Sequence, residues 1–253
     1  TNNQLTRVAA AAREMTAQTE AAAGSMNLLR AAVGGYLSLQ GAKGVTEMAD
    51  AYTNLQNRLR LITDGQAQLA QATDAVFNIA NRTSQAVGTV AEVYQRFGQN
   101  AKELGLSQRQ VAAVTDTVAK AVAISGASAG GAQAALTQFG QALASGVLRG
   151  EEFNSVMEQT PGLAAAIAKG MGVTVGELRA LAAEGKITAA ALIQALGKAA
   201  ADVDQQFNTR IKTVGQSFTE LQNSLQKFVG EAATTSGASK ALADTITLIS
   251  DNL

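Results

Sequence analysis

Apolar residues recur every three or four positions along most of this chain, which is the spacing of one face of an α-helix. The N-terminal repeat alternates between three and four residues and consists of Leu5, Val8, Ala12, Met15, Thr19, Ala22, Met26, Leu29 and Val33. Many of these side chains are small, so each buries little apolar area and we expect the helix to need partners. The pattern is compatible with packing inside one globule and with packing against another chain.

Capping motifs divide the middle of the chain into short helices. Thr63–Gln66, Ser107–Gln110 and Thr174–Glu177 each match the Ser/Thr-x-x-Glu/Gln capping box that opens a helix. Thr160 and Pro161 fit the N-cap and the first helical position, where proline costs least. Helices this short are not stable alone, so we expect them to pack together in a compact cluster.

The most regular heptad repeat lies near the C-terminus. Its apolar positions keep strict four-three spacing over three heptads, and they are Phe207, Ile211, Val214, Phe218, Leu221, Leu225 and Phe228. A period of 3.5 with large side chains is typical of a coiled coil, so we expect one helix here that forms a self-association interface. Packing of the same residues inside a globule is the alternative. After a break at Ser236–Gly237 the rhythm resumes with Leu242, Ile246, Ile249 and Leu253.

These patterns predict an all-α protein, with a compact cluster of short helices flanked by long coiled-coil-like helices. We divide the chain into an Ala-rich helix with a Gly-rich turn over 1–44, a cluster of packed helices over 45–200 and heptad helices over 201–253. The chain starts at Thr1 rather than at a methionine and stops inside a periodic segment. We therefore expect it to be part of a longer polypeptide.

Composition narrows the possible chemistry. The chain has no Cys, His or Trp, which excludes thiolate nucleophiles, Cys- or His-ligated metals and a Ser-His-Asp triad. Lys plus Arg and Asp plus Glu number 20 each, so a net charge of zero does not favour a nucleic-acid site. Apolar runs fall short of the roughly 18–20 residues that span a bilayer. We expect no cofactor, no metal site, no specific nucleic-acid site and no stable membrane span.

Three short motif matches have structural explanations that we favour over catalytic ones. Gly126–Gly130 fits the Gly-x-Ser-x-Gly elbow, but the elbow needs a preceding strand and a histidine, so an interhelical turn is expected. Ser224–Lys227 fits Ser-x-x-Lys without that class's companion motifs. Asp202 and Asp204 could bind a cation weakly, although we interpret them as solvated charges near a helix start. The protein is not expected to be an enzyme.

A longer ordered match carries more information. Ala144–Val156, Gln159–Leu163, Met171–Leu178 and Glu184–Thr188 resemble the tape measure domain of tailed-phage and prophage tail tape measure proteins. The resemblance covers roughly Lys43–Leu196. Its signature positions in this chain are Gly146, Arg149, Gly150, Glu151, Phe153, Thr160, Pro161, Gly162, Gly172, Glu177 and Gly185.

The resemblance implies a structural virion protein. Members of the family occupy the lumen of the tail tube, template tail length during assembly in the bacterial host cytoplasm, and leave at genome ejection. Expected partners are the tail tube protein, tail-assembly chaperones and further copies of the chain, with a trimer as the expected homo-oligomer. Two other interpretations remain: a non-viral all-helical protein-interaction module, and a membrane-active helical protein suggested by small-residue spacing such as Gly126 to Gly130.

Overall fold

The computed structural model describes residues 44, 46–144, 147–148 and 150–236. The N-terminal repeat, the heptad residues after Ser236, Gly146 and Arg149 lie outside this range. Residues Asp50–Gly230 form one compact unit. The three-segment division made from the sequence stays a prediction.

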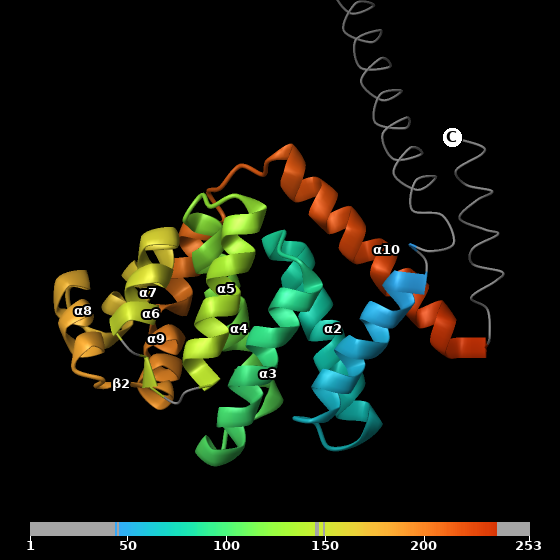
Figure 1. Ribbon diagram of the computed structural model, residues 1–253, viewed down its shortest axis with the longest axis horizontal. Coiled ribbons are helices and arrows are strands. Elements are labelled where there is room, and N and C mark those ends of the chain that lie inside the picture. The colour runs from blue at the N-terminus through green and yellow to red at the C-terminus, as the bar shows by residue number, and fades with distance from the viewer. Residues whose placement is uncertain (1–43, 45, 145–146, 149, 237–253) are drawn as a thin grey trace, which may run out of the picture. The chain divides into compact units, whose positions relative to one another are not determined.

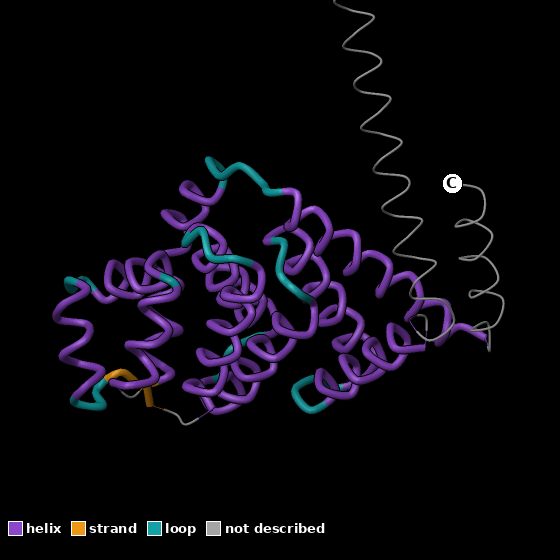
Figure 2. Tube along the Cα trace, turned by 45° about the horizontal axis from the view of Figure 1, so that its top comes forward, coloured by secondary structure: helices purple, strands orange, loops and turns teal. Residues whose placement is uncertain are grey.

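Helices make up almost all of the described part of the chain, which confirms the predicted all-α class (Figures 1 and 2). A first helix covers 46–60. The others are α2 (Gly65–Thr83), α3 (Val87–Leu104), α4 (Gln108–Ile124), α5 (Ala129–Ala144), α6 (Gly150–Gln159), α7 (Pro161–Met171), α8 (Val175–Ala183), α9 (Ala189–Phe207) and α10 (Val214–Ser236).

The described residues also contain one pair of very short strands. β1 (Val147–Leu148) runs antiparallel to β2 (Ile187–Thr188), with Val147 opposite Thr188 and Leu148 opposite Ile187. Two residues are too few to produce the alternating pattern by which a strand is recognised in a sequence. The pair closes the segment α6–α8 into a loop, since it joins its two ends.

Helix α4 is the centre of the compact unit. It packs against α2, α3, α5, α7 and α9. Its predicted apolar face is buried, as are residues on its other sides, and the buried set comprises Val111, Val114, Thr115, Thr117, Val118, Ala119, Lys120, Ala121 and Val122. A helix buried on most of its surface is typical of the interior of a helical domain.

Glycines allow α7 to approach its neighbours at backbone distance. A Cβ at Gly170 would lie 1.9 Å from the carbonyl oxygen of Ala195 on α9, and a Cβ at Gly162 would lie 2.6 Å from the carbonyl oxygen of Ala121 on α4. The Gly162 amide also donates to Ser125 Oγ at 3.0 Å. Alanines and glycines thus replace large side chains at these crossings, because close helix approach itself supplies the contact area.

The helix starts show where the local predictions hold. The capping boxes Ser107–Gln110 and Thr174–Glu177 are both present with reciprocal hydrogen bonds. Thr160 and Pro161 are the N-cap and first residue of α7 as predicted, although Thr160 Oγ1 donates backwards to the carbonyl of Val156. The predicted box at Thr63–Gln66 is wrong. There α2 starts after Asp64, and Thr63 Oγ1 instead donates to the Leu59 carbonyl.

The heptad segment is not one helix, which corrects the sequence expectation. α9 ends at Phe207 and α10 begins at Val214, so residues 208–213 form a bend between them. Ile211 lies in this bend. Polar contacts within residues 207–216 and one hydrogen bond from Arg210 to α2 hold the bend.

Candidate interaction surface

Helix α10 has two faces of opposite character. At 100° per residue, Gln216, Glu220, Asn223, Lys227 and Gly230 fall on one side of the helix. The other side carries the apolar stripe, which we define as Val214, Phe218, Leu221, Leu225 and Phe228. The first set contacts the rest of the compact unit, and the stripe faces away from it.

Asn223 makes the most buried contact of the polar side. Its side-chain amide donates to the Gln85 carbonyl at 2.8 Å, and its oxygen accepts from the Val87 amide at 3.2 Å. Asn223 is only 3% exposed. Because the N-cap of α3 is Ala86, which has no capping side chain, Asn223 satisfies a helix-start amide that α3 cannot satisfy itself.

Charged contacts flank Asn223 on both sides. Glu220 accepts hydrogen bonds from Ser84 and from Lys212, and Lys227 pairs with Asp74 of α2 at 2.7 Å. Burial by itself raises the pKa of Glu220, but the hydrogen bonds from Lys212 and Ser84 outweigh it and hold the pKa below its ordinary value. We call Ser84–Glu220, Asn223 with its two backbone partners, and Asp74–Lys227 the polar latch.

Arg210 fixes the bend that precedes α10. Its guanidinium lies 4.2 Å from the centre of the Phe207 ring and donates to the Arg82 carbonyl at 2.9 Å and to Gln216 Oε1 at 3.2 Å. Thr213 and Gln216 complete the start of α10 by exchanging hydrogen bonds between side chain and backbone in both directions. The bend is therefore held by side chains rather than by a glycine.

A second polar cluster joins α2, α4 and α9 through Lys120. This lysine is 8% exposed and pairs with Asp116 on its own helix at 2.7 Å and with Asp204 of α9. Asp116 also pairs with Arg82 at 2.6 Å, and the Lys120 ammonium lies 5.7 Å from the Phe207 ring. A cation buried in an otherwise apolar helix needs such partners, and its position within the Val111–Val122 run is the sequence signal that could have revealed it.

The placement of Asp202 and Asp204 corrects the sequence interpretation. Both lie towards the end of α9 rather than at a helix start, and both are paired with lysines. Asp202 meets Lys169 of α7, and the hydrogen bond from Lys169 lowers the pKa of Asp202 despite the opposing effect of burial. Their role in this structure is to join helices.

The heptad residues are divided between core, bend and surface. Phe207 is buried at the end of α9, whereas Ile211 in the bend is 93% exposed and Val214 is 76% exposed. Phe218 and Phe228 are exposed as well, while Leu221 and Leu225 are partly buried. Exposed apolar residues aligned on one helix face mark a candidate interaction surface. Self-association through these residues stays a prediction.

The described signature residues have structural roles. Phe153 and Thr160 are completely buried, and Gly162 permits the close crossing of α7 and α4. Gly172 and Gly185 adopt left-handed backbone conformations that favour glycine, with φ of 73° and 67°. Gly150 and Glu151 are the first two residues of α6, Pro161 is the first residue of α7, and Glu177 closes the capping box of α8.

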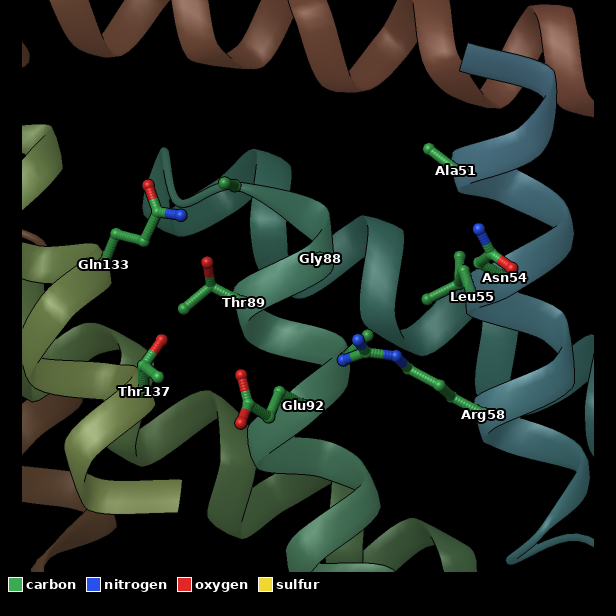
Figure 3. Close-up of a pocket in the computed structure, with 11 residues that line it drawn as sticks. Ala51, Asn54, Leu55, Arg58, Gly88, Thr89, Glu92, Gln133 and Thr137 are labelled. Atoms are coloured by element: carbon green, nitrogen blue, oxygen red, sulfur yellow. The ribbon is translucent and has the colours of Figure 1, made fainter. Parts of the chain in front are cut away.

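A shallow pocket of about 350 Å³ lies between the helix 46–60, α3 and α5 (Figure 3). Arg58 extends towards α3 from one wall, and Glu92 lies on the other. The remaining lining is small or neutral: Ala51, Asn54, Leu55, Ala86, Gly88, Thr89, Ala91, Gln133 and Thr137. One cation and one anion among neutral side chains do not form a nucleophile–base pair.

The short motif matches have structural roles. Ser128 lies in the turn between α4 and α5, where its hydroxyl accepts from the Gly131 amide, as expected for an interhelical turn. Ser224 donates to the Glu220 carbonyl of its own helix, and Lys227 belongs to the polar latch. Within the described residues, no cluster of three acidic, Cys or His side chains could hold a metal ion. The helices that the structure describes include none long and apolar enough to cross a membrane.

Comparison with known proteins adds one finding. A family model described as "Tape measure protein" matches residues 43–234, which is about three quarters of the chain. No curated protein and no solved structure matches.

Proposed function

We propose that this chain, which belongs to the tape measure protein family, is a structural component of a phage tail that occupies the lumen of the tail tube and sets tail length during assembly. The observation that carries the proposal is the family match, because it spans the whole compact unit Asp50–Gly230. Contact with the tube protein and with tail-assembly chaperones, and release at genome ejection, belong to the same proposal.

Within that role, the compact unit acts as a folded assembly-recognition module and not as a stretch of the ruler. About 180 residues in one straight helix would extend about 270 Å at 1.5 Å per residue. Here they form helices of no more than 23 residues that double back on one another, so residue number is not converted into length. The neutral net charge suits a protein that shares the tube with DNA and does not retain it.

A pair of glycine variants in the producing phage or prophage tests the module. Gly170→Ala places a Cβ against the α9 backbone and leaves chain length unchanged, whereas Gly197→Ala on α9 meets open space. We expect Gly170→Ala to abolish tail assembly and Gly197→Ala to give tails of normal number and length, as counted by electron microscopy. Normal tails from both variants would show that the fold of this unit is not needed.

An in-frame deletion of residues 46–234 tests the same point differently. We expect it to abort tail assembly, because the recognition module is gone. Tails that form normally and are shorter by about 280 Å would contradict the module and show that these residues serve as an extended helical ruler.

Self-association through the apolar stripe is proposed as the link between copies inside the tube. The expected state is a trimer, measured by sedimentation equilibrium of the whole chain. Phe218→Ser with Phe228→Ser is expected to shift the chain to monomer, because both side chains are exposed on the stripe. Leu61→Ser is the control, since Leu61 is 65% exposed but lies off the stripe. A chain that is monomeric before any substitution would contradict this part of the proposal.

A further inference from the structure

The heptad register continues through the bend between α9 and α10. Phe207, Ile211 and Val214 keep four-three spacing across residues 208–213, and this stretch has neither glycine nor proline. Asn208, which caps α9, has right-handed helical backbone angles. The local sequence is therefore compatible with a helix that runs straight from α9 into α10.

Polar contacts hold the chain in the bent form instead. The amides of Thr209 and Arg210 bond to carbonyls three residues back, which tightens the last turn of α9 before the chain leaves the helix. Arg210 then anchors to α2 and to Gln216, and the polar latch holds α10 against the α2–α3 corner. Water can replace each of these hydrogen bonds once the groups are exposed.

We propose that α10 is a releasable arm: when the polar latch opens, residues 208–213 become helical and α9 and α10 join into one helix over 189–236. Such a helix would be about 70 Å long at 1.5 Å per residue. The bend would gain regular helical hydrogen bonds in exchange for those of Arg210 and Thr213. Ile211 would join Val214 and Phe218 in one continuous stripe, whereas in the bent form it is 93% exposed in the bend.

The two forms give the apolar stripe two different lengths. In the bent form the stripe is limited to α10, and in the straight form it extends back to Ile211, next to the buried Phe207. A second copy of the chain that covers the longer stripe would favour the straight form in proportion to its higher affinity for it. That driving force rests on the proposed self-association, whereas the release of the arm is a property of one chain.

A distance measurement in the single chain tests the release. The chain has no cysteine, so Lys198→Cys on α9 and Ser224→Cys on α10 place two spin labels at exposed positions without background labelling. Pulsed electron paramagnetic resonance at dilute concentration then reports their separation. In the straight form the two Cα atoms lie about 39 Å apart. Glu220→Ala with Asn223→Ala opens the latch and adds good helix formers.

With the polar latch intact, we expect the distance distribution between the two labels to show the bent form alone. When the latch is opened by the two substitutions, we expect a second, narrow peak near the straight-helix distance. Adding Ile211→Pro must remove that narrow population, and adding Ile211→Ala, which removes the same side chain but allows helix, must keep it. Two results would overturn the proposal: an unchanged distance after the latch is opened, or a broad distribution that does not respond to proline, which would mean a detached but unstraightened arm. Because the labelled chain is studied as a monomer, failure here leaves the tail role untouched.

Discussion

The contact between α7 and α9 and the contact between α10 and the α2–α3 corner are made in opposite ways. α7 meets α9 backbone to backbone, at a distance that leaves no space for a methyl group at Gly170. α10 meets the α2–α3 corner through the polar latch, in which side chains span the gap and the apolar stripe is left facing outwards, and only the end of α10 at Gly230 packs closely, against Tyr52. The first contact is made with small side chains, and the second with long polar ones.

The difference predicts which part of the unit is permanent and which can be rearranged. Close backbone packing depends on dispersion over many atoms and has no substitute in water. Hydrogen bonds and exposed ion pairs exchange readily for bonds to water, so their net contribution is small. The α4–α7–α9 core is thus expected to persist under conditions in which α10 comes off.

The largest effect is expected from the α7–α9 contact. Gly170→Ala should lower the free energy of unfolding by about 3 kcal/mol, because the α9 backbone must move to admit the new methyl group. Gly197→Ala, in the interior of α9 with nothing near its Cβ, should raise it by about 0.5–1 kcal/mol through helix propensity. Urea unfolding measures both. Equal changes in the free energy of unfolding for the two substitutions would show that the close backbone contact at Gly170 does not determine stability.

A smaller loss is expected at the Lys120 cluster. Lys120→Met should lower the free energy of unfolding by about 2 kcal/mol, a value between those for exposed and for fully buried ion pairs. The loss is intermediate because Asp204 is half exposed and water can hydrate it once the lysine is gone. Lys186→Met removes a lysine that pairs with Glu184 on the surface and should leave unfolding unchanged. Urea titrations of the two variants side by side give the comparison, and a Lys120→Met protein as stable as the parent would contradict a structural role for the cluster.

A substitution in the polar latch should destabilise α10 and its contacts without affecting the rest of the compact unit. Asn223→Ala leaves the Val87 amide and the Gln85 carbonyl without their partner. It should lower the free energy of unfolding by only about 1 kcal/mol, because water can bond to these groups when α10 lifts away. Faster hydrogen exchange should be confined to α10 and the start of α3, with α7 and α9 unaffected. Ser224→Ala on the same helix is the control, and uniform acceleration across the unit would contradict a separable arm.

The smallest expected effect is the acid response of the latch. The folded-state pKa of Glu220 lies below the ordinary value of 4.5, so its contribution to docking is present above that pH and is lost as the pH falls through the folded-state value. The distance between labels at positions 198 and 224 should therefore begin to change below pH 4.5. Glu220→Gln should weaken this response, and a variant with the parent's profile would contradict a role for Glu220 in it.

The sequence predicts local structure well where a helix start or end has its own chemistry. Ser107–Gln110 and Thr174–Glu177 are recognisable because the bonding partners are three residues apart. The spacing at Thr63 is the same, but its hydroxyl has a competing acceptor in the Leu59 carbonyl one turn back, and this bond forms instead.

Contacts between distant residues could not be predicted in this way. Asn223 bonds to backbone groups of residues 85 and 87, and Lys120 pairs with Asp204, and neither separation leaves a periodic trace in one sequence. The bend is the clearest case. Its heptad spacing runs on without interruption, whereas the bend is made by the Thr213–Gln216 hydrogen bonds at the start of α10 together with Arg210, Glu220 and Asn223, which bond to distant parts of the fold.

The contact between Gly230 and Tyr52 has a further consequence. A Cβ at Gly230 would lie 2.0 Å from the Tyr52 ring, so the first and last helices of the compact unit touch and the chain enters and leaves it at neighbouring points. A domain with adjacent ends can be carried as a side branch of a longer polypeptide, with little effect on the path of the chain on either side. In a tape measure protein, evolution could then lengthen or shorten the flanking segments independently of this branch.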